Sequence, residues 1–176
     1  MVSSRAHARD LYASNLGSSM AKIETERLRY NFWKQLLKKS NKKTPLFSKI
    51  SATKAAAKEQ FISKNAGITG VKYQYIILKN AARVQLSIES KYTDKNKRIF
   101  DILHESKARI ERDFGERLVW ERNNKLISSR IKKIFENRGL NDKHDWGKIQ
   151  DEMISAMIRL ERALSKHIQK MTWILL

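Results

Sequence analysis

The chain has 176 residues and a formal net charge of +19, because 37 lysines and arginines outnumber 18 aspartates and glutamates. It has 1 proline, 6 glycines and no cysteine, which excludes a collagen-like or low-complexity protein, a disulfide framework and a cysteine-based zinc site. No stretch approaches the roughly 20 apolar residues of a membrane-spanning helix, so we expect a cytoplasmic protein without a membrane partner.

The first part of the chain is expected to hold an arm followed by a helix. Residues 1–20 are rich in serine, alanine and asparagine and show no sustained period, so we predict a flexible N-terminal arm. Residues 21–176 are predicted to form a single α+β domain with a long C-terminal helix. Apolar residues at helical spacing predict the first helix of this domain over 22–39. The stretch 46–69 shows no clear pattern, apart from an alanine run that predicts a short helix over 54–58.

Residues 71–89 have the clearest β pattern of the chain. Apolar and polar residues alternate on both sides of a turn at 79–82, and this alternation predicts a β-hairpin with one buried and one wet face. The wet face would carry Lys72, Arg83 and Gln85.

The second half of the chain is predicted to contain two helices with two strands between them. The first helix covers 94–114, with Asp94 as its cap and Gly115 at its C-terminus. Strand patterns follow within 117–135, although the second of them also fits a helical period. The strongest helix pattern covers 145–171. The resulting order α-β-β-α-β-β-α predicts an α+β fold, in which an antiparallel sheet of three to four strands is packed by helices.

Lysine dominates one segment of the chain. Nine lysines and no arginine lie from Lys34 to Lys64, where Glu59 is the only acid. The flexible ammonium group of lysine suits contact with phosphates and not bidentate base recognition, so this segment predicts sequence-independent binding to a nucleic-acid backbone. A solvated basic loop is the alternative interpretation.

The residues predicted to contact nucleic acid come from this segment, from the hairpin and from the region after the hairpin. Tyr92 is the candidate for base stacking, because it lies among lysines. The predicted set is Lys38, Lys39, Lys42, Lys43, Lys49, Lys54, Lys58, Arg83, Lys91, Tyr92, Lys95 and Lys97.

Signals for catalysis are weak in this sequence. The four histidines are far apart and form no ligand pair, so we expect no metal and no other cofactor. Glu89-Ser90-Lys91 matches half of a nuclease pattern, in which carboxylates hold Mg²⁺ and a lysine helps to activate water. The first strand of the hairpin has no second carboxylate. A magnesium-dependent nuclease with Glu89 and Lys91 as catalytic residues is therefore an alternative hypothesis.

A third hypothesis is a protein-interaction or oligomerisation module. The apolar stripe of 145–171 and the apolar residues 173–176 offer a surface for an acidic partner, or for a homodimer through the C-terminal helix. The same stripe is also typical of an ordinary core helix.

Several blocks of sequence follow one another in an order that carries a family resemblance. They are Tyr30–Leu37, Ala82–Ile88, Asn96–Leu103, Ile110–Arg122, Ser129–Ile131 and Ala156–Leu164. Together they resemble the prokaryotic family named domain of unknown function 4268, over about residues 25–168. The family often has glutamate where this chain has Gln85, and tyrosine where it has Ser87.

The resemblance implies a role beside nucleic acid. Members of the family occur alone or joined to nuclease-like domains in restriction-type or DNA-defence proteins, an association that assigns no catalytic residue. The resemblance also favours a strand over 127–134. Together with the net charge, it leads to the main hypothesis: an accessory module without catalysis of its own that binds nucleic acid, DNA rather than RNA.

Overall fold

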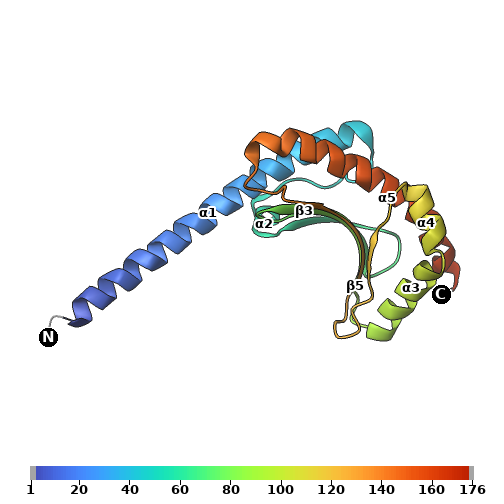
Figure 1. Ribbon diagram of the computed structural model, residues 1–176, viewed down its shortest axis with the longest axis horizontal. Coiled ribbons are helices and arrows are strands. Elements are labelled where there is room, and N and C mark those ends of the chain that lie inside the picture. Colours follow the sequence, from blue (N-terminus) through green and yellow to red (C-terminus); the bar gives the residue numbers. More distant parts are fainter. Residues whose placement is uncertain (1–2, 175–176) are drawn as a thin grey trace.

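One antiparallel sheet with helices on one of its faces makes up the fold (Figure 1). The computed structural model describes the backbone of residues 3–174 and the side chains of residues 16–172. The strands are β1 (Phe61–Asn65), β2 (Val71–Ile77), β3 (Ala81–Ile88), β4 (Val119–Glu121) and β5 (Ser129–Glu136), in the spatial order β1-β2-β3-β5-β4. The helices are α1 (Ser3–Lys43), α2 (Lys54–Lys58), α3 (Thr93–Glu105), α4 (Lys107–Phe114) and α5 (Trp146–Ile174), with the 3₁₀ turn η1 (Lys143–Asp145) before α5. The predicted α+β class with an antiparallel sheet is confirmed.

The sheet has five strands, which is more than the three to four predicted. The predicted hairpin is β2–β3, in which Tyr75 pairs with Val84, and both strands expected after the next helix are present as β4 and β5. The additional strand is β1, which pairs with β2 at the edge of the sheet. Ile62 is the one fully buried residue of β1. An edge strand with so little apolar alternation pairs through its backbone, and the sequence pattern therefore does not reveal it.

The first helix is longer than the sequence pattern predicts. It begins at Ser3 and not near residue 22, so residues 3–20 are helical. Figure 1 shows that this early part of α1 extends away from the rest of the molecule, and its sequence has no apolar stripe. The later part packs on the body, where Phe32 meets Trp146 of α5 edge-on, with ring centroids 5.3 Å apart. The flexibility expected for residues 1–20 stays a prediction.

The helix predicted over 94–114 is divided at Ser106 into α3 and α4. Gly115 ends α4 with a left-handed backbone at φ 94°, as predicted, because glycine adopts this conformation without steric cost. Asp94 is not the cap of α3. The capping position is Tyr92, whose side chain makes no capping hydrogen bond, and Asp94 lies in the first turn of the helix.

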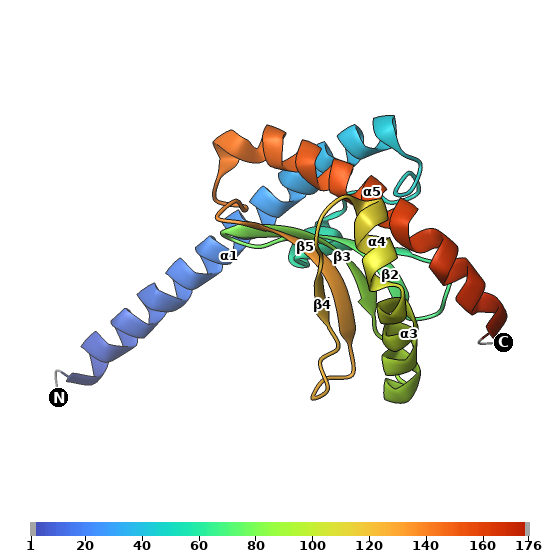
Figure 2. The ribbon, with the colours of Figure 1, turned by 45° about the vertical axis from the view of Figure 1, so that its right-hand side comes forward.

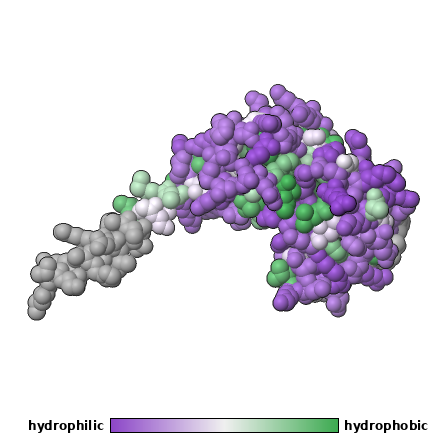
Figure 3. Space-filling model, viewed as in Figure 1, coloured by the Kyte–Doolittle hydropathy of each residue, from purple (hydrophilic) through white to green (hydrophobic). Residues whose placement is uncertain are grey.

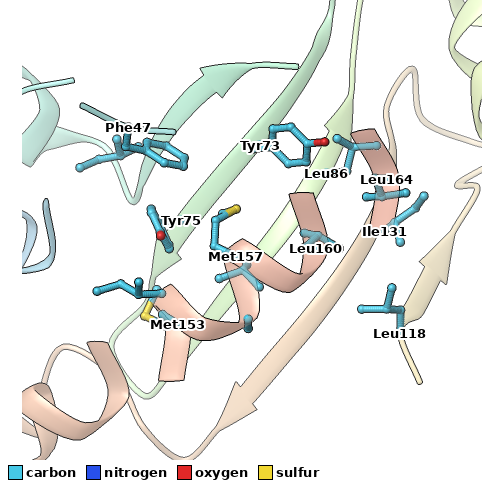
Figure 4. Packing of buried hydrophobic residues seen from close by; sticks show 14 of the residues in the cluster. Phe47, Tyr73, Tyr75, Leu86, Leu118, Ile131, Met153, Met157, Leu160 and Leu164 are labelled. Carbon is cyan, nitrogen blue, oxygen red and sulfur yellow. The ribbon is translucent and has the colours of Figure 1, made fainter. Parts of the chain in front are cut away.

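The core lies between the sheet and the helices (Figure 4). Met153 and Met157 of α5 and Tyr75 of β2 belong to the same buried cluster. The stripe predicted over 145–171 is therefore largely covered by the chain itself, and a protein partner or a homodimer through the C-terminal helix stays a prediction. Residues 173–176, the other part of that hypothesis, lie outside the described side chains.

The second face of the sheet is concave, and α3, α4 and α5 lie on the opposite side, whereas the early part of α1 projects beyond the sheet (Figure 2). Seen from the side of Figure 3, the exterior is mostly hydrophilic, with a smaller hydrophobic area over the middle of the molecule. Among the described residues, no helix is long and apolar enough to cross a membrane. On the concave face Lys72 is exposed and Arg83 and Arg130 are partly exposed, whereas most of the other side chains of the central strands are buried.

Candidate functional site

The concave face of the sheet, which we call the open sheet face, carries a regular set of polar and basic side chains. Side chains of a strand alternate between the two faces, so the neighbours of the core residues Tyr73, Tyr75, Val84 and Leu86 point to the open side. The central strands place there Lys72, Gln74 and Ile76 of β2, Arg83, Gln85 and Ser87 of β3, and Arg130, Lys132 and Ile134 of β5. The edge strands add Phe61 of β1 and Val119 and Glu121 of β4.

The strand register arranges these side chains in cross-strand rows. Lys72 lies opposite Ser87, which lies opposite Arg130. Adjacent strands are about 4.8 Å apart, so the Lys72 and Arg130 positions are separated by roughly 10 Å. Two rows further along the same face, Arg83 lies between Ile76 of β2 and Ile134 of β5. Basic groups from three strands therefore converge on one concave surface.

The floor of this concavity is made of amide side chains. Gln85 is only 3% exposed, and its Nε2 donates a hydrogen bond to Oε1 of Gln74 at 2.7 Å. Oε1 of Gln85 is buried and has no hydrogen-bond partner among the described residues. A buried acceptor without a donor costs free energy, so this oxygen is a position where a ligand or a water molecule is favoured.

Two arginines above this floor lack a carboxylate partner within the described part of the chain. Arg83 is half-buried, and its Nε has no hydrogen-bond partner. Burial lowers the pKa of Arg83, the positive charge of Arg130 lowers it further, and Glu121 acts in the opposite direction. Glu121 itself forms an ion pair with Lys132, with Nζ and Oε1 2.5 Å apart. Arg83 and Arg130 thus form no ion pair of their own among the described residues, and Glu121, which lies opposite Arg130 in the strand register, is paired with Lys132.

A hollow of about 450 Å³, which we call the end hollow, adjoins the open sheet face where β2 begins and β3 ends. Lys72 lines both surfaces, and Lys91 and Lys95 line the hollow from the start of α3. Nζ of Lys91 lies 4.9 Å from the ring centre of Tyr92, a cation–π contact. Because α3 has no side-chain cap, its first backbone N–H groups add partial positive charge to this end of the sheet. The end hollow therefore extends the basic surface.

The nuclease pair of the sequence analysis is brought to the end hollow. Glu89 and Lys91 both line it, and Glu89 is the only carboxylate among its lining residues. Within the part of the chain that the structure describes, no group of three histidine, aspartate or glutamate residues could hold a metal ion. The two-carboxylate clamp that this chemistry uses is therefore incomplete at Glu89.

The lysine-rich segment lies elsewhere on the molecule. Lys38, Lys42, Lys43 and Lys49 are exposed at and after the C-terminal end of α1, on the side of the sheet that carries the helices. Two of the lysines at this end are partly compensated by one carboxylate of α5. Nζ of Lys39 lies 3.2 Å from Asp151, and Nζ of Lys43 lies 3.4 Å from it. This cluster is separate from the open sheet face.

The lysines of α2 are near the opposite end of the strands from the end hollow. Lys54 and Lys58 are exposed, and Lys58 lines a hollow of about 310 Å³ together with Lys22, Arg29 and Lys79. Arg29 in turn holds the end of α2, because its Nη1 donates to the backbone oxygen of Lys58 at 3.1 Å. Basic groups are thus present at both ends of the strands.

Lys97 is not available to a nucleic acid, which corrects the sequence prediction. Its side chain is buried, and Nζ donates to the backbone oxygens of Arg122, Asn123 and Ser128 at 2.6 to 3.0 Å and to Oγ of Ser129 at 3.1 Å. This lysine fastens α3 to the loop between β4 and β5. It has a structural role.

Sequence analysis missed the basic residues of β5, Arg130 and Lys132. The segment around them fitted both a strand and a helix, and only the strand places them on the face that also carries Arg83. The available signal was the alternation of Arg130 and Lys132 with the buried Ile131.

The comparisons with known proteins give one family. The family described as domain of unknown function 4268 matches residues 28–168, which is more than half of the chain. Neither the curated proteins nor the solved structures contain a match.

Proposed function

The chain belongs to the family described as domain of unknown function 4268, and from this premise we propose that it is a nucleic-acid-binding accessory module. In this proposal the module has no catalysis of its own and works beside a restriction or DNA-defence nuclease. It binds the phosphate backbone, of DNA rather than RNA, without reading its sequence.

The observation that carries the proposal is the basic surface on the concave side of the sheet. Lys72, Arg83 and Arg130 lie on the open sheet face, and Lys91 and Lys95 continue it into the end hollow. Two acids near them, Glu89 in the end hollow and Asp94 in the first turn of α3, form no ion pair among the described residues. A concave surface with charges of one sign concentrates the field and attracts a polyanion.

The geometry suits contacts to phosphates more than contacts to base edges. The lysines offer compact charges on flexible stems, which suit backbone contacts. Phosphate contacts position a protein on nucleic acid without carrying sequence information. The proposed module would therefore locate a partner enzyme on nucleic acid, while recognition and chemistry come from that enzyme.

The proposal is tested by the salt dependence of binding. If about five phosphates are neutralised, the association constant for duplex DNA falls roughly 500-fold between about 50 and 200 mM monovalent salt. Fluorescence anisotropy with a labelled oligonucleotide measures this directly. Absence of binding to both duplex and single-stranded DNA at the lower salt concentration, or an affinity that does not change with salt, would refute the proposal.

The nuclease hypothesis is tested on the same material. Incubation with Mg²⁺ or Mn²⁺ and labelled DNA should leave the DNA intact if the module only binds. Cleavage that disappears in Glu89→Gln while binding is retained would establish the metal-dependent nuclease in its place.

A further inference from the structure

We infer that the open sheet face holds single-stranded nucleic acid, with a phosphodiester between Arg83 and Arg130 and an unpaired base against Phe61. The inference rests on the proposed function and specifies its substrate class. Three features of the face support it, and none of them depends on net charge alone.

The first feature is the pair of arginines. Arg83 and Arg130 lie on the same face of neighbouring strands, four residues apart in the strand register, and the positive charge of Arg130 helps to lower the pKa of Arg83 by repulsion. A guanidinium group presents a planar fork of donors that binds two phosphate oxygens at once. A phosphodiester between the two groups would remove the repulsion and give the unpaired Nε of Arg83 an acceptor.

The second feature is an exposed aromatic ring on the same face. Phe61 is 40% exposed, although it belongs to a strand, and it lies opposite Ile76, which lies opposite Arg83. The Phe61 and Arg83 positions are thus two strands apart, at about 10 Å. Bases stack on such rings, whatever their identity, when they are not already stacked and paired in a duplex.

The third feature is the buried amide of Gln85. Its Oε1 needs a donor, and Gln85 follows Arg83 on the same face of β3. The amino groups of bases are such donors. In a duplex the Watson–Crick edge is already occupied by the complementary strand, whereas an unpaired base can turn this edge toward the floor of the concavity.

Binding to single-stranded and duplex DNA of the same sequence tests the inference. Duplex DNA has the higher charge density, so a surface that recognises charge alone would prefer it. We expect a single-stranded oligonucleotide of about 12 nucleotides, within the usual site sizes, to bind more tightly than the duplex at equal salt.

Variants of Phe61 identify the contact. Phe61→Ala should weaken single-strand binding at least about five-fold, and Phe61→Trp should restore it, because stacking is a property of the ring. Leu126→Ala is the control: Leu126 is 54% exposed in the loop between β4 and β5, outside the open sheet face, and its replacement should leave the affinity unchanged. Thermal unfolding of each variant shows that the fold is retained.

The outcomes separate this inference from the proposed function. Duplex binding that equals or exceeds single-strand binding, or equal effects of Phe61→Ala and Leu126→Ala, would overturn the single-strand inference and leave the backbone-binding module standing. Loss of all nucleic-acid binding at low salt would overturn both.

Discussion

The chemistry of a lysine in this protein is decided by its position. Lys95 and Lys97 are two residues apart on α3, yet Lys95 lines the end hollow whereas Lys97 is buried with four oxygen acceptors around its ammonium group. Both residues are lysines of the same predicted helix, so the sequence alone does not distinguish their roles. On a helix they lie on different sides, and only one side faces the body of the protein.

Lys97→Met should therefore destabilise the protein. The change leaves buried carbonyl oxygens without donors, and we expect a loss of about 2–4 kcal/mol in the free energy of unfolding. Lys95→Met is the control and should change it by less than about 0.5 kcal/mol. Urea unfolding followed by circular dichroism measures both, and equal stability of the two variants would contradict the structural role of Lys97.

At the scale of elements, charged side chains tie the helices to the edge of the sheet. Glu116, in the loop after α4, accepts hydrogen bonds from Lys133 of β5 and from Arg159 of α5, the latter at 2.9 Å. Burial raises the pKa of Glu116, but these two cations outweigh that effect and hold the pKa below its usual value of 4.5. The ionised carboxylate of Glu116 thus connects the end of α4 with β5 and α5.

The stability contributed by Glu116 should depend on pH. Because its pKa is lower in the folded state than in the unfolded state, the contribution is complete above about pH 4.5 and is lost as the pH falls through the folded-state value. Glu116→Gln should cost about 1 kcal/mol at pH 7, a modest figure because the group is partly exposed, and this difference from the parent protein should shrink in acid.

Urea unfolding at a series of pH values between neutral and acid measures this effect. Glu105→Gln, at an exposed position at the end of α3, serves as the control and should track the parent protein throughout. A cost for Glu116→Gln that stays constant down to acid pH would show that the ion pairs do not stabilise the fold.

At the scale of the whole molecule, the helices divide the basic residues into separate surfaces. The cluster at the end of α1 lies on the helical side, where Asp151 compensates part of its charge. The basic groups of the open sheet face lie on the concave side. The net charge of +19 is therefore spread over more than one surface, and the proposed function depends on one of them.

Two double variants with the same loss of charge distinguish these surfaces. Lys72→Gln with Lys91→Gln should reduce the slope of log K against log salt by about 2, because two phosphate contacts are lost. Lys38→Gln with Lys42→Gln removes the same net charge from the helical side and should leave the slope within about 0.5 of the parent value. The opposite ranking in anisotropy titrations would place the contact surface on the lysine-rich segment.

The local patterns of the sequence were sufficient for much of the fold and for part of the candidate site. Alternation identified the β2–β3 hairpin and placed Lys72, Arg83 and Gln85 together on its wet face. Helical spacing identified α5, and Gly115 identified the end of α4. These features depend on residues a few positions apart, whose relation is set by the period of a helix or a strand.

Only the tertiary structure decided which of these features act together. The pairing of β3 with β5 places Arg130 on the same face as Arg83, and the packing of α3 buries Lys97. Each of these results depends on contacts between residues far apart in the chain, and they follow from how the apolar faces of whole elements are buried against one another. A sequence period gives the direction of a side chain relative to its own element, and packing then determines whether that direction leads to the core or to solvent.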